Sequence, residues 1–394
     1  MASNTERTTA CRLRLGDLRV KKWDLIVIGA GPAGSSCAAL CAKAGMKVLL
    51  LESARFPREK VCGDCLNPAV WPILDSLDIS QRVQGLPNSS PGIIRFTMDG
   101  QRSVEIPLLK SSGEVVIRRR EFDALLVERA IEFGAVFQDG IPVTSLQRVQ
   151  GEWHITTAQG VIGSAPVIVA ADGRNSSVAR HLRMLSSPIR DDRVGIQTQI
   201  SHPEGYDGAL EMHLYQNGYG GLADLGQGQA NLCLVSNAGA MRQLRKEAED
   251  LYQVNPAIAW RSIIPISRPQ ARSVARDGVF LCGDAACVVE PFTGEGIAFA
   301  LRTGSQLARI LISPRESLPG DREKKICRCP PPDLSGQTSY QLSDALPLAA
   351  SPIGSFSGTI VVPFSRCSFS HGSQSHTMRL IKEYNTFFYC IGMN

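Results

Sequence analysis

The sequence predicts an α/β protein in which a Rossmann-like domain, made of discontinuous segments, carries an inserted antiparallel β-sheet domain. Two observations predict the Rossmann-like part: a glycine-rich turn between a strand and a helix in residues 24–34, and two later strands that each lead into an acid and a glycine. Alternating apolar and polar residues in 93–109 and 191–270 predict the inserted sheet.

The first junction lies in residues 24–34, which read DLIVIGAGPAG. The turn contains the three glycines of a G-x-G-x-x-G pattern, namely Gly29, Gly31 and Gly34. The first permits a tight turn, the second lets the backbone approach a pyrophosphate, and the third lets the helix pack closely. A second apolar strand, Val48–Leu51, ends on Glu52, which can accept hydrogen bonds from a ribose. This segment therefore predicts a site for FAD or NAD.

Two later junctions repeat the same arrangement. The strand pattern 166–170 leads to Asp172-Gly173, and the strand pattern 279–282 leads to Gly283-Asp284. Small residues follow the second of these, and Thr293-Gly294-Glu295-Gly296 stands just before another helix pattern. Because glycines let a ligand come close and helix starts attract negative charge, we expect one extended ligand to join the three junctions.

An amphipathic helix is predicted over residues 118–133. Arg119 lies at its start, where the helix dipole disfavours a cation. Either a phosphate or a carboxylate offsets this charge, or Arg119 is simply a solvated side chain. The sequence favours neither alternative.

Composition excludes several classes of protein. The chain has 394 residues, is 43% hydrophobic and carries a formal charge of +5, without a basic block long enough to predict nucleic-acid binding. It contains no apolar run long enough for a transmembrane segment. Its 12 scattered cysteines favour a reducing, cytoplasmic location over a disulfide framework. Residues 1–22 are interpreted as a disordered extension, or as the result of a start codon placed too early.

These motifs together resemble FAD-dependent enzymes of the para-hydroxybenzoate hydroxylase fold. The resemblance rests on the glycine turn with Glu52, on Arg119-x-x-Phe122-Asp123, on Ala171-Asp172-Gly173-Arg174, and on Gly283-Asp284-Ala285-Ala286 with Pro291-Phe292-Thr293-Gly294-Glu295-Gly296. It covers residues 23–313. That superfamily includes aromatic-ring monooxygenases, flavin-dependent halogenases and geranylgeranyl reductases.

The resemblance implies a set of cofactor-binding residues. They are Gly29, Gly31, Pro32, Ala33, Gly34, Glu52, Cys62, Gly63, Arg119, Asp172, Gly173, Gly283, Asp284, Gly294, Gly296 and Ile297. In this family the glycine turn holds the FAD pyrophosphate, and the residue at the position of Asp284 binds the ribityl chain or pyrophosphate. The segment Gly294–Ile297 would lie against the isoalloxazine ring.

Two stretches resemble the reductase and halogenase branch. Residues 59–68, EKVCGDCLNP, contain the Lys-x-Cys-Gly run that lines the cofactor there, and the Gly-Tyr-Gly at 218–220 resembles a turn that begins a hairpin over the substrate. The tryptophan-rich motif of halogenases is absent after residue 220. No second G-x-G-x-x-G occurs, which agrees with a family that has no separate NAD(P)H domain.

Cys62-Gly63-Asp64-Cys65 allows three interpretations. The segment lines the cofactor or is structural, or its thiols form a redox pair beside the flavin, or they bind a metal. The metal interpretation lacks a second pair with suitable spacing, because Cys327-x-Cys329 does not provide it.

The predicted organisation has four parts. Residues 1–22 are an extension, residues 23–92, 110–190 and 271–313 form the FAD-binding domain, residues 93–109 and 191–270 form the substrate domain, and residues 314–394 form a tail. The tail is rich in Pro, Ser and Gly and lacks periodicity, so it is read as disordered, frame-shifted or unspliced sequence. An ordinary linker with a short helix over 377–389 is the alternative.

The predicted function is that of an FAD-dependent, NAD(P)H-linked oxidoreductase, a reductase or a monooxygenase, that acts on an apolar or aromatic small molecule. No catalytic side chain and no metal site are assigned, because the flavin carries the chemistry. Two alternatives stay open: a truncated FAD-binding paralogue without turnover, and a dithiol flavoprotein reductase that uses Cys62 and Cys65.

Overall fold

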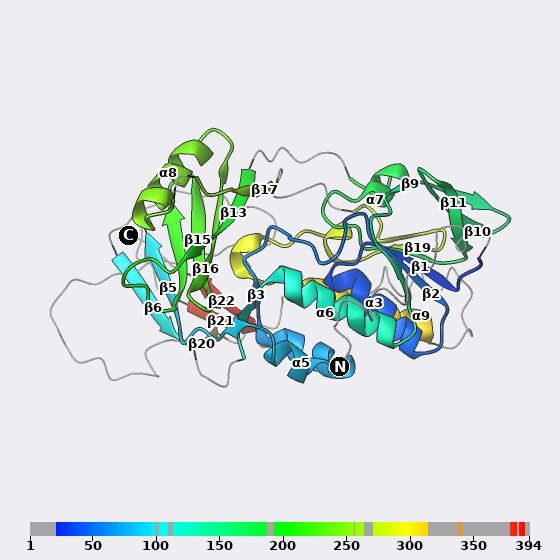
Figure 1. Cartoon of the computed structure of the whole chain (residues 1–394), viewed down its shortest axis with the longest axis horizontal. Helices are drawn as coiled ribbons and strands as arrows, with labels where there is room; N and C mark the ends of the chain where they lie inside the picture. Colours follow the sequence, from blue (N-terminus) through cyan, green and yellow to red (C-terminus); the bar gives the residue numbers. More distant parts are fainter. Residues whose placement is uncertain are drawn as a thin grey trace. The chain divides into compact units, whose positions relative to one another are not determined.

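The computed structural model describes residues 21–98, 102–108, 113–186, 193–255, 257–263 and 271–313, with three short strands between 339 and 390 (Figure 1). The chain divides into two compact units, 1–328 and 329–394. The extension predicted for 1–22 lies outside the described residues except for its last two positions.

The second unit contains one small antiparallel sheet. Its strands, in order, are β20 (Ser339–Tyr340), β21 (Arg379–Glu383) and β22 (Thr386–Cys390). The alternative helix over 377–389 is therefore wrong. The remainder of the predicted tail lies outside the described residues.

A six-stranded sheet forms the centre of the first unit, with the order β18-β19-β12-β1-β2-β8. Five strands are parallel: β1 (Leu25–Ile28), β2 (Val48–Leu51), β8 (Val136–Gln138), β12 (Ile168–Ala170) and β19 (Val279–Leu281). The edge strand β18 (Ala275–Arg276) is antiparallel. Every residue of β1, β2, β12 and β19 is buried, which explains why these strands are continuous apolar runs in the sequence.

Both faces of this sheet are covered. The helices α3 (Pro32–Lys43), α6 (Arg119–Glu132) and α9 (Gly296–Ile312) pack on one face, against residues such as Leu25 and Val27. The other face packs against α7 (Ser177–His181) and an antiparallel sheet of β9 (Val143–Val149), β10 (Glu152–Thr157) and β11 (Gly160–Ala165). In Figure 1 the three helices lie below β1 and β2, and β9–β11 lie above them.

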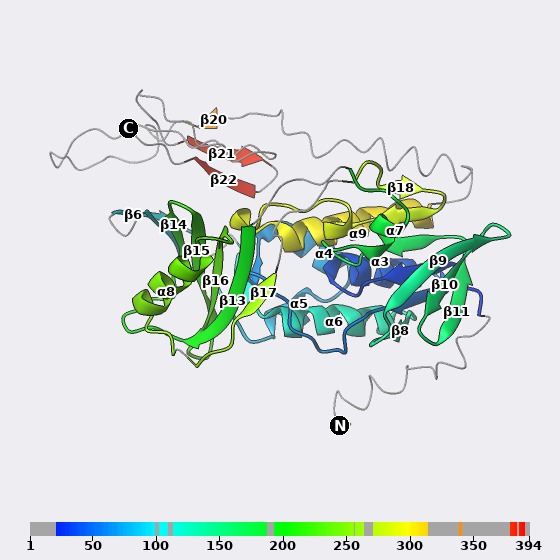
Figure 2. The ribbon, with the colours of Figure 1, turned by 90° about the horizontal axis from the view of Figure 1, so that it is seen from above.

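A seven-stranded sheet has the order β17-β13-β16-β15-β14-β5-β6. Its strands are β5 (Ile93–Met98), β6 (Arg102–Pro107), β13 (Arg193–Ser201), β14 (Leu210–Tyr215), β15 (Gly218–Gly226), β16 (Gln229–Asn237) and β17 (Arg261–Ile263). Neighbouring strands are antiparallel except β14 and β5, which pair in parallel. The helix α8 (Met241–Leu251) covers the face that points away from α6 and α9 (Figure 2).

The opposite face of this sheet meets the small sheet β3-β7-β4, made of β3 (Cys65–Leu66), β7 (Val115–Ile117) and β4 (Asn88–Ser89). Ala223 and Leu225 of β15 pack on Val116 of β7. Two short helices, α4 (Trp71–Ser76) and α5 (Ser80–Gln84), lie between β3 and β4 in the chain. This contact brings the seven-stranded sheet next to the Cys62–Cys65 segment.

The predicted fold class is confirmed: a mixed α/β protein has a parallel sheet with a glycine turn and a separate antiparallel sheet. The seven-stranded sheet is built from residues 93–107 and 193–263, and the domain boundaries themselves stay predictions. Gly218–Gly220 lies within strand β15 and not in a turn. No helix in the described ranges is long and apolar enough to span a membrane.

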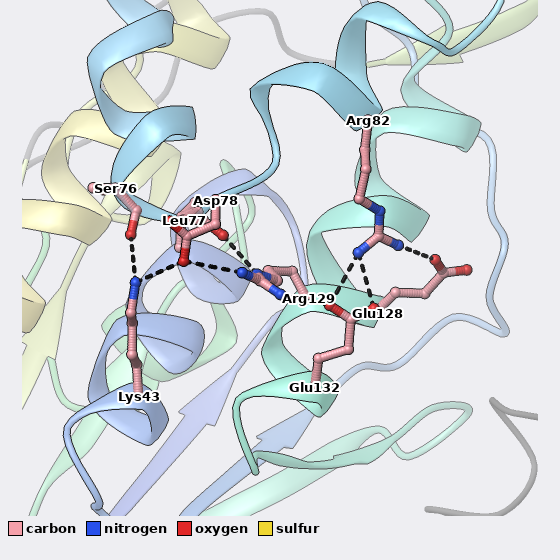
Figure 3. A network of polar contacts seen from close by, with 8 residues as sticks. All are labelled: Lys43, Ser76, Leu77, Asp78, Arg82, Glu128, Arg129 and Glu132. Carbon is pink, nitrogen blue, oxygen red and sulfur yellow. Dashed lines mark hydrogen bonds and ion pairs between the residues drawn. The ribbon is translucent and has the colours of Figure 1, made fainter.

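An ion-pair network on the surface fixes α6 to the α4–α5 segment (Figure 3). Asp78 accepts from Lys43 Nζ at 2.8 Å and from Arg129 Nη2 at 3.0 Å, and Arg129 Nε donates to the Leu77 carbonyl at 2.6 Å. Arg82 pairs with Glu128 and Glu132. Exposed pairs contribute at most about 1 kcal/mol each, so their main effect is to orient α6, whose first turn carries Arg119.

Candidate functional site

The glycine turn is shaped by contacts that only glycine allows at two of its positions. A Cβ on Gly29, which has φ +103°, would lie 2.3 Å from the Ala171 carbonyl oxygen, and one on Gly34 would lie 1.9 Å from the Gly29 oxygen. A Cβ on Gly31 would instead meet only Arg58 Nη2, at 3.7 Å. Gly29 and Gly34 are thus required by packing, whereas Gly31 leaves an open surface that a ligand can approach.

The start of α3 is suited to an anion. Its N-cap is Gly31, no side chain caps it, and its first turn, with Pro32 and Ala33, contains no acid. The backbone N–H groups of the first turn are therefore available to a diphosphate. A Cβ on Gly283 would lie 2.8 Å from the Ala33 Cβ, so the third junction packs directly against this helix start.

Glu52 is buried beside the turn and holds it in shape. One carboxylate oxygen accepts from the Ala30 N–H at 3.0 Å, and the other accepts from the Ala54 N–H at 3.0 Å and the Ser53 hydroxyl at 3.1 Å. Each oxygen keeps acceptor capacity for a ribose hydroxyl. The structure thus adds a turn-stabilising role to the predicted one.

Asp123 connects two cations at the site. Its fully buried carboxylate accepts from Arg119 Nε and Nη2, both at 2.8 Å, and from Arg58 Nη1 at 2.9 Å. A carboxylate partner for Arg119 is therefore present, and the solvated alternative is wrong. Arg58 Nε also lies 3.8 Å from Glu52 Oε2, so its guanidinium group joins the two carboxylates, and its Nη2 lies beside Gly31, where it can meet a diphosphate. Sequence reasoning missed Arg58 and the role of Asp123, although Asp123 is four residues after Arg119 in the quoted motif.

The three junctions meet through packing contacts, because Gly29 of the first lies against Ala171 of the second and Gly283 of the third lies against Ala33 of the first. Lys60 lies near the second and third junctions. Burial lowers the pKa of this amine, Arg119, Arg58 and Arg174 lower it further, and Asp284 opposes them, although the Lys60 side chain is exposed to solvent.

The thiols of the Cys62–Cys65 segment are free and protonated. Burial raises the pKa of Cys62 against the opposing charge of Arg119, and burial raises the pKa of Cys65 far above its usual range. Reactive dithiols need a lowered pKa, so this environment favours the lining or structural interpretation. A Cβ on Gly294 would lie 3.9 Å from the Cys65 Cβ, which puts this segment beside the bend before α9.

Two predicted residues have other visible tasks. The Ile297 side chain is 4% exposed and packs in the core beneath the helices, so only its backbone can face a ligand. One Asp172 oxygen accepts from the Ser177 N–H at 2.8 Å and the Val178 N–H at 3.2 Å, and it thereby caps α7. Added Cβ atoms on Gly63, Gly173 and Gly296 would meet no neighbouring atom within 4 Å.

The bend before α9 is also tied to the seven-stranded sheet. Glu290 accepts from the Tyr219 hydroxyl at 2.8 Å and from both terminal nitrogens of Arg193, at 3.2 and 3.1 Å. The Tyr219 ring stands edge-on to the Phe292 ring, with 5.2 Å between the ring centroids. The ring centroids of Phe292 and Phe96 are 6.3 Å apart. Sequence reasoning did not find this cluster, because its members come from three strands and a loop and form no local motif.

Known proteins show similarity over most of the chain. A family described as "FAD binding domain" matches residues 22–194 and 235–322. Menaquinone reductase of Mycolicibacterium smegmatis is 30% identical over 324 residues, which cover 74% of this chain and 76% of that protein. Digeranylgeranylglycerophospholipid reductase 2 of Methanopyrus kandleri is 27% identical over 309 residues, 72% of this chain and 75% of that protein.

Solved structures show the same fold. PqsL of Pseudomonas aeruginosa in complex with 2-aminobenzoylacetate has a TM-score of 0.67 at 19% identity, over 77% of this chain and 90% of that one. The myxobacterial chondrochloren halogenase CndH has a TM-score of 0.66 at 21% identity, over 77% of this chain and 78% of that one. The chain therefore belongs to the FAD-binding-domain family of flavoproteins and is an FAD-dependent oxidoreductase.

Proposed function

We propose that the protein is an NAD(P)H-linked reductase that saturates a double bond of an apolar or aromatic small molecule at the FAD site. The predicted cofactor-binding residues keep this role in the proposal, with Arg58, Lys60 and Asp123 added to them. The compounds in the names of two relatives, menaquinone and digeranylgeranylglycerophospholipid, both carry long apolar isoprenoid chains, which supports a substrate with an apolar reacting part.

The observation that carries this proposal is the apolar part that β5, β14 and the start of β15 contribute to the sheet face on which Gln197 and Asn231 also lie. Met212 of β14 stands opposite Gly221 of β15 and beside Phe96 of β5, so these positions share the face that carries Tyr219. Gly221 lets the Met212 side chain pack closely on β15, because a Cβ at position 221 would lie only 3.1 Å from Met212 Sδ. A face of this kind favours contact with hydrocarbon or an aromatic ring over contact with a charged substrate.

FAD, when bound and reduced by NAD(P)H, would supply the hydride for the double bond, with the proton taken from solvent, and the described residues would supply its environment. The uncapped start of α3 and the Arg58 guanidinium group beside Gly31 would hold the diphosphate. The start of α9 also lacks a side-chain cap, so its N–H groups could stabilise negative charge on the reduced ring. The chain has no second glycine-rich dinucleotide motif, so we infer that NAD(P)H binds transiently over the same cleft.

The test starts with the visible spectrum of the purified protein, which should show bound flavin. NADH or NADPH is then mixed anaerobically with the enzyme and a polyprenyl quinone, and the products are re-oxidised so that any quinol returns to the quinone. A quinone two mass units heavier than the starting compound is expected, because the two added hydrogens then lie on a side-chain double bond. Oxygen uptake that depends on the substrate would instead identify a monooxygenase. Flavin that is never reduced by either nicotinamide would contradict the proposal and support the alternative of FAD binding without turnover.

The dithiol alternative is tested separately. Replacing Cys62 and Cys65 together by Ser should leave flavin reduction by NAD(P)H and reduction of the substrate within a few-fold of wild type. Complete loss of transfer to a disulfide substrate, with flavin reduction intact, would favour a dithiol reductase over our proposal.

A further inference from the structure

The backbone of Cys62 is held by two amide side chains of the seven-stranded sheet. Its N–H donates to Gln197 Oε1 at 3.2 Å, and its carbonyl accepts from Asn231 Nδ2 at 2.8 Å. Gln197 Nε2 donates to Asn231 Oδ1 at 2.8 Å, so the two amides also fix each other. Gln197 thus offers an acceptor to the Cys62 N–H and Asn231 offers a donor to the Cys62 carbonyl. A neighbouring β-strand would satisfy the Cys62 backbone in the same way.

Burial indicates that these contacts matter. Gln197 is 4% exposed and Asn231 is 1% exposed, and they lie on the adjacent strands β13 and β16. Burying an amide costs several kcal/mol unless its hydrogen bonds are made, and apolar side chains would fill the same face without that requirement. The sequence thus keeps two polar groups where packing alone would favour apolar ones.

Asp64 extends the network to α6. Its side chain is 2% exposed, and its backbone has a φ of 61°. One carboxylate oxygen accepts from Asn231 Nδ2 at 3.0 Å, and the other accepts from the Arg119 N–H at 3.3 Å. Residues 62–64 are therefore tied to the sheet on one side and to the start of α6 on the other.

We propose that Gln197 and Asn231 are positioning residues that set the Cys62–Gly63 segment against the flavin end of the site. They act through the backbone of Cys62. Their hydrogen bonds fix the position of the segment that would line the flavin relative to the sheet that would carry the substrate. This inference rests on the proposed place of the cofactor beside Cys62 and Gly63, and it does not depend on the identity of the substrate.

The test uses Asn231→Leu and Gln197→Met in the full-length, FAD-loaded protein. Both changes nearly conserve volume and remove the amide hydrogen bonds to Cys62, whereas the Cys233 thiol, whose Sγ lies 3.2 Å from the Cys62 carbonyl oxygen, remains in both variants. FAD should stay bound, because the glycine turn and Glu52 are untouched. The visible bands of the flavin should shift, and its reduction by NAD(P)H should slow by about 10- to 100-fold, the usual effect of small misplacements in an active site.

A donor-independent measurement separates this inference from the proposed function. The reduction potential of the bound flavin, measured against a reference dye, should change in both variants even if neither nicotinamide is the electron donor. Folded variants with the wild-type spectrum, potential and reduction rate would overturn the inference. If Asn231→Leu does not fold, Gln197→Met decides the outcome.

Gln199→Leu is the matched control. Gln199 lies on the same strand and the same face as Gln197, opposite Asn231, and makes no hydrogen bond to residues 62–64 in the described part of the chain. This variant should keep the wild-type spectrum and potential. An equal effect of Gln199→Leu would mean that general packing of the sheet, and not the hold on Cys62, sets the flavin environment.

Asn231→Asp gives a pH-dependent form of the same test. The introduced carboxyl would lie against Asp64, the Cys62 carbonyl and the Cys233 thiol, where Asn231 makes its contacts. Arg119, Asp123 and Glu59 act on Asp64, and Cys62 and Cys65 act on Cys233, so these are the charged and titratable groups around the position. When protonated it can donate to the Cys62 carbonyl, and when ionised it cannot. The flavin spectrum should therefore approach wild type at acid pH and resemble that of Asn231→Leu at alkaline pH. If the flavin spectrum of Asn231→Asp differs from that of wild type by the same amount at every pH, the inference is contradicted.

Discussion

The two large sheets of the first unit contribute to the site in different ways. The parallel sheet presents backbone: glycines that permit close approach, and the uncapped start of α3. The antiparallel sheet presents side chains, such as Gln197, Asn231 and Tyr219, from alternate positions of its strands. A ligand that contacts the backbone requires glycine at fixed positions in the chain, so the parallel half of the site leaves a sequence motif. A side chain on the antiparallel sheet needs only to lie on the correct face of its strand, so that half leaves no motif.

The largest effect is expected in the backbone-presenting half, from Gly34→Ala. The added Cβ would overlap the Gly29 oxygen, a backbone atom that cannot move aside. We expect a loss of at least about 3 kcal/mol in unfolding free energy, measured by urea denaturation. Gly31→Ala is the matched control, because it meets only the tip of Arg58: it should fold normally and weaken FAD binding. Equal stability of both variants would contradict the comparison.

Asp123→Asn tests the charge arrangement in the same half. The change gives Arg119 a neutral partner in place of a buried carboxylate, while Arg58 keeps its second carboxylate, Glu52. Unfolding free energy should fall by about 3 kcal/mol, since a buried charge pair is broken from one side. Glu132→Gln, on the exposed network of the same helix, should cost less than about 1 kcal/mol. A smaller loss in Asp123→Asn than in Glu132→Gln would refute this assignment.

Asp64→Asn tests the junction between the halves through pH. Burial raises the pKa of Asp64 to about 8, while Arg119 opposes this shift. The folded state therefore keeps the proton that the unfolded state releases near about pH 4, and the contribution of Asp64 to wild-type stability falls by about 1.4 kcal/mol per pH unit between the two values. Asp64→Asn has no carboxyl group to titrate at this position. The difference between its unfolding free energy and that of wild type should therefore rise with pH up to about pH 8 and then stay constant. Denaturation curves at several pH values check this, and a constant difference would exclude the raised pKa.

Tyr219→Phe should have the smallest effect, in the side-chain-presenting half. It removes the hydroxyl that donates to Glu290 and keeps the ring beside Phe292. We expect a loss of about 1 kcal/mol in stability, measured by thermal unfolding, with FAD binding unchanged. Loss of FAD from this variant would show that the bend before α9 depends on the sheet more strongly than the contacts suggest.

The sequence predicted the parallel half well. The strands Leu25–Ile28 and Val48–Leu51 have the predicted bounds, because runs buried on both faces are unambiguous beside a glycine turn. The strand Gly218–Gly226 was missed, since its glycines have low strand propensity and only pairing on both sides makes it a strand. The contacts of Arg58 and Asp123, and the amide pair on Cys62, depend on tertiary packing that leaves no spacing pattern.

The parallel pairing of β5 with β14 has a consequence for how the protein folds. Arg95 and Glu211, which form an ion pair across these strands, are 116 residues apart in the chain. Loops of this length must close before the pairing can form, and such high contact order slows folding. During synthesis the hairpin of β5 and β6 must therefore wait for more than a hundred further residues to leave the ribosome before its partner strand β14 can pair with it.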